Sequence, residues 1–250
     1  MKRTPRPQNW QFVLLAGIIG ALCCNGPIAF AQDSQQDRGS QDTASDSKSI
    51  SDETDFVSLF NGTDLDGWIG ATDGYGVEDG VIFCKPQGGN LYTAEEYANF
   101  TLRFEFKLQA GSNNGLGIRT PPRGDAAYVG MELQILDNTA EQYANLKEYQ
   151  YHGSVYGIAP AKRGFLKSVG EWNAQEVICD GRRVKVILNG ETIVDVDLDE
   201  VAPDGKTVDG REHPGLANTQ GHIGFLGHGS RVEFRNIRIR VHSADDDGQQ

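Results

Sequence analysis

The chain has 250 residues, of which 38% are hydrophobic and 23% are charged, a balance that excludes a membrane bundle and a chain that is disordered throughout. Its formal net charge is -12 at pH 7. An acidic chain repels phosphate backbones, so nucleic acid is excluded as an expected partner. Glycine supplies 31 residues, above its usual share of about 7%, which predicts many tight turns.

The first 31 residues have the composition of a signal peptide. Three basic residues within the first six precede an apolar stretch over residues 12–24, and Ala29-Phe30-Ala31 supplies the small residues of a cleavage site. The apolar stretch is shorter than the roughly 20 residues that span a bilayer. We therefore expect residues 1–31 to be removed on export to the periplasm or the exterior, leaving no stable membrane span.

The remainder of the chain divides by composition. Residues 32–54 are rich in Gln, Ser, Asp and Thr, and they contain too little apolar surface to offset the entropy of ordering, so a disordered polar linker is expected. Residues 244–250 form an acidic tail of the same kind. Residues 55–243 have the length of one sandwich domain with its own core.

Two cysteines, Cys84 and Cys179, remain once the leader is removed. In an oxidising compartment such a pair can form a disulfide. Two separate buried thiols are an equal alternative, because Val177 and Cys179 share an apolar strand face. The sequence leaves both open.

In much of residues 55–243, apolar and polar residues alternate with a period of two. Between Phe100 and Leu108 apolar residues alternate with polar ones, the pattern of a strand with one buried face. Asn189-Gly190 between apolar runs predicts a hairpin, and a change of phase predicts a bulge near Arg235-Asn236. Only residues 93–99 and 139–147 could be short helices. We therefore predict an all-β fold, a jelly-roll sandwich of two antiparallel sheets.

The segment over residues 130–137 carries the strongest indication of chemistry. Its apolar residues alternate with Glu132 and Gln134, so these two side chains are expected on the opposite face, about 7 Å apart. If this strand pairs with the preceding one, Arg119 shares that surface, and Gly115 and Gly117 keep it open to a ligand. The alternative is an ordinary salt bridge between Glu132 and Arg119 on a solvated face.

Further polar and aromatic residues complete the candidate site. His228 lies between glycines at an expected tight turn, and His152 is placed similarly, although a lone loop histidine is more often structural. Trp172 could stack on a sugar ring or fill the core. Glu132, Asp137 and His228 form an acid/base set if they converge.

A series of short motifs follows in order along the domain. They occupy residues 56–62, 65–68, 113–119, 130–137, 153–157, 170–173, 188–190, 228–229 and 232–239. In this order the chain resembles the bacterial 3-keto-disaccharide hydrolase family, also described as 3-keto-glucoside 1,2-lyase and 3-keto-2-hydroxy-glucal hydratase. The resemblance covers residues 56–241 and implies a concanavalin- or laminarinase-like jelly roll.

The resemblance also implies a reaction, elimination and hydration across C1 and C2 of a 3-keto-glycoside. We assign Glu132 as the base at C2, His228 as the acid toward the leaving oxygen and Arg119 as the charge that holds the enolate or a hydroxyl. The roles of Glu132 and His228 could be reversed. The residues expected to bind the ring are Gln134, Asp137, Tyr156, Trp172 and His152.

Several alternatives stay open at this point. No cofactor is required. A divalent cation held by Glu132, Asp137 and His228 could nevertheless replace Arg119 in stabilising the negative charge of the enolate. A non-catalytic carbohydrate-binding module would use the same concave face without chemistry, and a purely structural domain is a third reading. The glycoside, its linkage and the oligomeric state are not specified by the sequence.

Overall fold

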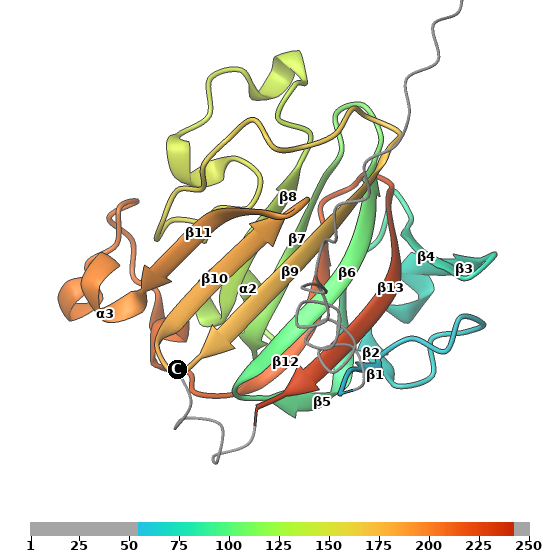
Figure 1. Ribbon diagram of the computed structural model, residues 1–250, viewed down its shortest axis with the longest axis horizontal. Coiled ribbons are helices and arrows are strands. Elements are labelled where there is room, and N and C mark those ends of the chain that lie inside the picture. The colour runs from blue at the N-terminus through green and yellow to red at the C-terminus, as the bar shows by residue number, and fades with distance from the viewer. Residues whose placement is uncertain (1–54, 243–250) are drawn as a thin grey trace, which may run out of the picture. The chain divides into compact units, whose positions relative to one another are not determined.

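A computed structural model describes residues 55–242, and the predicted leader, linker and acidic tail lie outside the described residues. Two antiparallel sheets pack against each other, with the larger sheet toward the viewer in Figure 1. This arrangement confirms the predicted jelly-roll sandwich. Within residues 55–242, no helix is long and apolar enough to cross a membrane.

The larger sheet has eight strands. In spatial order they are β11 (Glu191–Asp197), β10 (Arg183–Leu188), β9 (Trp172–Asp180), β6 (Phe100–Leu108), β13 (Val232–Val241), β4 (Val81–Cys84) and β3 (Tyr75–Glu78), with β1 (Val57–Ser58) also paired to β13. Strands β6 and β13 form its centre. Their alternate apolar residues face the second sheet, as the period-two pattern predicts.

The smaller sheet has five strands, and one of its edges carries the candidate site. The order is β2 (Trp68–Gly70), β5 (Asn90–Tyr97), β12 (Gly221–Gly227), β7 (Asn113–Thr120) and β8 (Met131–Leu136). Strands β7 and β8 pair antiparallel, with Gly117 opposite Glu132 and Gly115 opposite Gln134. The predicted pairing of these strands is therefore confirmed.

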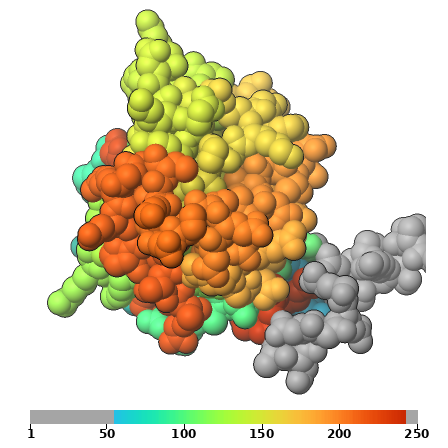
Figure 2. Space-filling view, turned by 90° about the vertical axis from the view of Figure 1, so that its left-hand side faces the viewer, coloured from blue at the N-terminus to red at the C-terminus, as the bar shows by residue number. Residues whose placement is uncertain are grey.

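Short helical turns connect the strands. They are η1 (Thr72–Gly74), α2 (Ala126–Val129), η2 (Glu141–Tyr143), η3 (Glu148–Gln150), α3 (Leu198–Val201), η4 (Pro203–Gly205) and η5 (Pro214–Ala217). In Figure 2 the orange segment that contains α3 occupies one side of the domain, below the yellow-green segment that contains η2. Chain outside the sheets thus covers part of the sandwich.

Aromatic packing holds the two sheets together. Phe225 of β12 stacks on Phe234 of β13 with ring centroids 3.7 Å apart, and Phe104 of β6 meets Phe225 edge-on at 5.9 Å. All three side chains are buried. Burial of each contributes on the order of 1.5–3 kcal/mol, so this cluster fixes the spacing between the sheets.

Two local predictions are confirmed and two are wrong. Asn189 and Gly190 have φ values of 52° and 91°, as a tight hairpin requires, and the β13 register shifts between Arg235 and Arg238. Residues 93–99 are not helical, because β5 pairs there with both β2 and β12. Residues 139–147 contain only the single turn η2.

Of the two alternatives for the cysteines, the disulfide is wrong. Cys84 and Cys179 are both buried and free. Cys84 lies on β4 and Cys179 on β9, and strands β6 and β13 separate them. Three strand spacings of about 4.8 Å exceed the limit of about 7 Å between the Cα atoms of a disulfide. The alternative of two separate buried thiols holds.

Candidate active site

Glycines of β7 lie next to the neighbouring strands β8 and β12 of the five-stranded sheet. Gly117 of β7 lies between Glu132 of β8 and Gly224 of β12, and Gly115 neighbours Gln134. A Cβ atom at position 115 would lie 2.0 Å from Oε1 of Glu132. The Glu132 carboxyl group therefore lies over the backbone of Gly115, in space that only glycine leaves free.

A cleft of about 320 Å³ is lined by Glu132 and its neighbours. Its walls come from the sheet, from α2 and from the segments that follow β8 and β11. The polar residues that line it are Asn113, Asp125, Tyr128, Glu132, Gln134, Tyr143, Gln150, Tyr156, Arg211 and His228. Four predicted residues, Glu132, Gln134, Tyr156 and His228, are thus brought together.

Strand β8 is the edge of its sheet, and the loop after it covers that edge. The Gln134 N–H donates to the Ser154 carbonyl at 3.0 Å, and the Tyr156 N–H donates to the Glu132 carbonyl at 2.8 Å. These bonds place the Tyr156 ring beside the cleft, where its hydroxyl accepts a hydrogen bond from Gln150 at 3.0 Å. The covered edge fixes one wall of the site.

Glu132 and His228 form the chemical centre of the cleft. His228 Nε2 lies 3.0 Å from Glu132 Oε1, and the side chains are 42% and 5% exposed, respectively. The hydrogen bond to Glu132 raises the pKa of His228 above its ordinary value, burial opposes this, and the charges of Glu132 and Asp125 add to the rise. The imidazole therefore keeps its proton to a higher pH than a free histidine does.

Two residues that line the cleft have a buried amide oxygen with no partner among the described residues. Gln134 is 6% exposed and its Oε1 atom makes no hydrogen bond, and Oδ1 of Asn113 is likewise unpaired. A buried acceptor without a partner costs free energy unless something donates to it. The hydroxyl groups of a bound sugar are donors of the required kind.

Asp125 is a site residue that the sequence reasoning missed. Its carboxylate caps the short helix α2 by accepting the Ala127 N–H at 3.3 Å, and it also lines the cleft. In the sequence it looks like one more polar loop residue, so only the fold reveals its place near His228.

The predicted role of Arg119 is wrong. Its guanidinium is buried and donates to the carbonyls of Ala98 and Gly181, at 3.1 and 2.7 Å, and to Oδ1 of Asn99 at 3.1 Å. Arg119 has a φ of 49°, and the β12–β7 register shifts beside it. This irregularity breaks the alternation that would have placed Arg119 beside Glu132.

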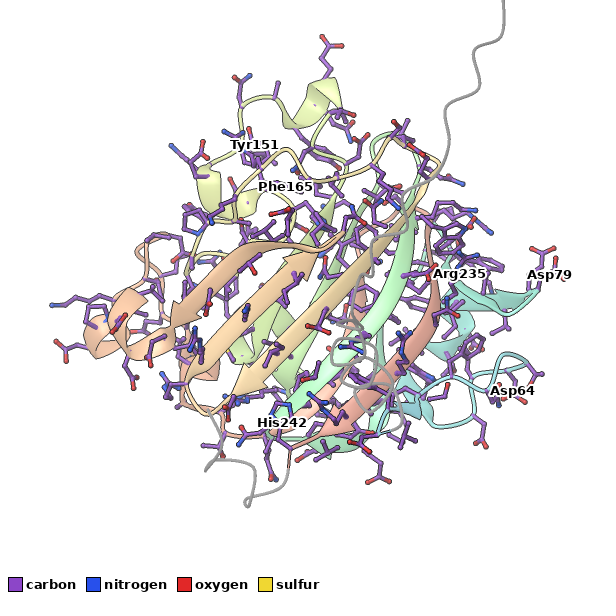
Figure 3. The ribbon with its side chains drawn as sticks, viewed as in Figure 1. Asp64, Asp79, Tyr151, Phe165, Arg235 and His242 are labelled. Carbon is purple, nitrogen blue, oxygen red and sulfur yellow. The ribbon has the colours of Figure 1, made fainter. Side chains whose placement is uncertain are left out.

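Trp172 and His152 also lie outside the cleft. Trp172 belongs to β9 of the other sheet, where Arg235 stacks over its ring at 4.0 Å; Arg235 is marked in Figure 3. His152 is buried 5.0 Å from the Phe106 ring, and burial lowers its pKa to about 3. His152 is a neutral core residue, so neither side chain is placed to bind the sugar.

Asp137 lies in a neighbouring cleft and organises a loop. Its carboxylate accepts hydrogen bonds from the Gly111 N–H at 2.8 Å and from the Thr139 hydroxyl at 2.6 Å. Burial opposes its charge, but these bonds outweigh burial and lower its pKa. No group of three or more His, Cys, Asp or Glu in the described part of the chain could hold a metal ion, so the alternative cation set is not assembled.

Comparisons with known proteins agree with this fold. The 3-keto-alpha-glucoside-1,2-lyase-like domain family matches residues 55–240. A 3-keto-disaccharide hydrolase of Bacteroides thetaiotaomicron is 24% identical, over 91% of this chain and 96% of the relative.

Two crystal structures of candidate glycosyl hydrolases from Parabacteroides distasonis are also similar. One is 30% identical with a TM-score of 0.67 and covers 75% of this chain and 99% of its own. The other is 26% identical with a TM-score of 0.63, with coverage of 75% and 94%.

Residues 55–242 form a two-sheet β-sandwich with a polar cleft. From Asp55 to Arg240, the chain belongs to the 3-keto-alpha-glucoside-1,2-lyase-like domain family. This membership favours a hydrolase over a non-catalytic binding module.

Proposed function

We propose that this protein hydrolyses 3-keto-glycosides by eliminating the C1 substituent and then adding water across C1 and C2. The observation that carries the proposal is the Glu132–His228 pair, a buried carboxylate 3.0 Å from a half-exposed imidazole, in a cleft lined by polar side chains. Family membership supports the same chemistry.

The proposed chemistry depends on the ketone. A carbonyl at C3 acidifies the hydrogen on C2, because the electron pair left behind is delocalised onto the C3 oxygen. A hydroxyl at C3 has no such effect. A protein with one base, one acid and a stabiliser of the C3 oxygen can then complete the elimination.

Elimination uses the pair in its charged form. The Glu132 carboxylate takes the proton from C2, the freed electrons form the C1–C2 double bond, and the bond from C1 to the leaving oxygen breaks. Protonated His228 gives its proton to that oxygen. The raised pKa of His228 supports its assignment as the acid, because the imidazole then carries the proton that the leaving group needs.

Hydration restores the starting state. Neutral His228 takes a proton from water as the water oxygen adds to C1. Glu132 exchanges its proton with solvent while the intermediate is bound, and then gives a solvent-derived proton to C2. One water is consumed, and both side chains recover their original charges. Gln134 and Asn113 accept hydrogen bonds from ring hydroxyls, and Tyr156 contacts the ring from the opposite wall.

A binding module is the weaker reading of this cleft. Jelly-roll modules that only bind sugars rely on aromatic platforms with few titratable groups. Trp172, the residue expected to form such a platform, lies on the other sheet. The cleft instead contains a carboxylate paired with an imidazole, which a proton-transfer reaction requires and simple binding does not.

The test compares a 3-keto-disaccharide with its unoxidised parent at equal concentrations. We expect release of the free sugar from the ketone alone, measured by chromatography. Equal cleavage of both compounds would contradict the elimination mechanism, since direct hydrolysis does not need the ketone.

We also propose that the protein is exported and acts in the periplasm or outside the cell. The basis is the leader at residues 1–31, with its basic start, apolar centre and Ala29-Phe30-Ala31. The N-terminal sequence of the protein recovered from the producing cell should begin at Gln32. An intact Met1 in the recovered protein would contradict export by this route.

A further inference from the structure

Elimination places negative charge on the C3 oxygen of the sugar, and a hydrogen-bond donor must face it. The sequence reasoning gave this task to Arg119, whose donors are engaged by Ala98, Asn99 and Gly181 elsewhere in the fold. The cleft contains another arginine, Arg211, which contacts an aromatic hydroxyl.

Arg211 and Tyr128 form a tight pair on the wall of the cleft. The guanidinium lies 3.8 Å above the Tyr128 ring and also donates a hydrogen bond to the Tyr128 hydroxyl oxygen. Both residues line the same cleft as Glu132 and His228. A hydroxyl that accepts from a cation becomes a stronger donor through its own hydrogen.

The Tyr128 hydroxyl retains that hydrogen at neutral pH. Burial raises its pKa, as do its neighbour Tyr156 and the carboxylates of Asp209 and Asp125, whereas Arg211 acts in the opposite direction. The phenol is therefore a neutral donor that its cationic partner polarises without removing the proton.

Buried contacts behind Tyr128 hold it in place. The His213 ring lies 4.6 Å from the Tyr128 ring, and its Nε2 atom is 3.1 Å from the Asp209 carboxylate. The same carboxylate accepts the Arg211 backbone N–H at 2.9 Å. A Cβ atom at Gly157 would lie 2.5 Å from Asp209 and 2.8 Å from His213, so this wall packs tightly.

We propose that the Tyr128 hydroxyl, polarised by Arg211, donates a hydrogen bond to the C3 oxygen of the sugar as charge develops there. No covalent bond to Tyr128 forms or breaks, and its proton stays on the phenol. Tyr128 is thus a catalytic residue and Arg211 a positioning residue that acts through it. This assignment rests on the proposed elimination at the same cleft.

The first test is Tyr128→Phe in the full mature chain. The substitution removes the donor and keeps the ring that packs on His213 and Arg211. With a 3-keto-glycoside, kcat should fall by about 10²–10³ with little change in KM, the effect of losing one donor to a developing oxyanion. Tyr97→Phe is the matched control, because Tyr97 lies on β5 and packs on Phe100 outside the cleft.

A double-substitution cycle tests the role of Arg211. Arg211→Gln alone should lower kcat, but the same change in the Tyr128→Phe protein should cost less than about threefold, because the hydroxyl that it polarises is already gone. An equal loss in both backgrounds would show that Arg211 acts directly on the sugar and would overturn its positioning role.

Binding of the elimination product, the 2-hydroxy-3-keto-glucal, separates the two proposals. In this product the ring oxygen is conjugated through C1=C2 with the C3 carbonyl, so the C3 oxygen carries more negative charge than in the substrate ketone. Calorimetry should therefore show about tenfold weaker binding of the product to Tyr128→Phe than to the wild type, even if the wild type proves inactive. Unchanged kcat and unchanged affinity in Tyr128→Phe would overturn the Tyr128 assignment while wild-type turnover upholds the proposed function. If the wild type neither binds the product nor turns over the ketone, both proposals are overturned.

Discussion

The two sheets of the sandwich differ in the exposure and in the partners of the charged side chains that they carry. On the eight-stranded sheet, Arg235 lies 2.7 Å from Glu105 with side chains 38% and 28% exposed. On the five-stranded sheet, Glu132 is 5% exposed and its partner is a histidine. The larger sheet therefore carries a partly exposed ion pair, whereas the smaller sheet carries a buried carboxylate.

The difference lies in what surrounds each charge. Ion pairs and aromatic rings occupy the outer face of the larger sheet, as where Lys107 and Arg235 lie over Trp172. Beside Glu132 the strands instead have glycine at positions 115 and 117, with Leu226 close to Gly117, and two nearby amide oxygens are buried without a partner among the described residues. The candidate site is thus distinguished from the outer face of the larger sheet by a buried carboxylate and unpaired amide oxygens, rather than by the number of its charges.

The largest expected effect follows from neutralising the buried carboxylate. Glu132→Gln keeps the shape and reach of the side chain but removes the base, so turnover of a 3-keto-glycoside should fall by roughly 10²–10⁴ while ligand affinity changes little. Glu105→Gln on the other sheet is the matched control and should retain full activity. Full activity in Glu132→Gln would contradict its role as the base.

A methyl group at position 115 should displace the Glu132 carboxylate, which lies over the Gly115 backbone. The Cβ of Gly115→Ala would lie 2.0 Å from Glu132 Oε1, so the carboxyl group must move. A displacement of about 1 Å at a catalytic group can cost on the order of 10² in rate. Steady-state kinetics check this, with circular dichroism as the control for folding. Unimpaired turnover would mean that the position of Glu132 is not critical.

The coupling of the pair can be measured through His228. Its pKa should lie above the ordinary 6.5 in the wild type and fall in Glu132→Gln, because the largest cause of the rise is removed. A raised histidine pKa stabilises the fold below about pH 6.5, and that contribution disappears as the pH rises through the folded-state value. NMR titration of the ring protons gives both values, and equal values would show that the side chains are uncoupled.

The smallest effect is expected on the larger sheet. Glu176→Gln removes an ion pair with Arg103 whose side chains are 19% and 21% exposed. Pairs of this kind contribute about 0–1 kcal/mol, so denaturant unfolding should show a change within that range and activity should not change. A loss of several kcal/mol would show that this face contributes much more than a solvated surface does.

Pattern reasoning succeeded where the strands are regular. Alternation placed Glu132 and Gln134 on one face, because β8 is an uninterrupted strand paired to β7. The same counting failed for Arg119, since the left-handed residue at that position breaks the alternation and no local pattern announces it. Residues 93–99 were misread because pairing on both sides overrides local helix signals.

The rest of the site depends on long-range closure. Tyr128 and Arg211 are 83 positions apart in the chain and meet only when the segment after β11 folds over α2. Cys84 and Cys179 show the converse, because both lie on core strands but two other strands separate them. Neither the contact between Tyr128 and Arg211 nor the separation of the two cysteines can be predicted from spacing along the chain.

The most direct test of the central claim is to run the reaction in D₂O and follow C2 by NMR. If Glu132 removes the C2 proton and water adds back across C1 and C2, the released 3-keto sugar should carry deuterium at C2. The incorporation must exceed the exchange seen without enzyme and in Glu132→Gln. A released sugar that keeps its original hydrogen at C2 would contradict elimination and leave direct hydrolysis at C1 as the mechanism.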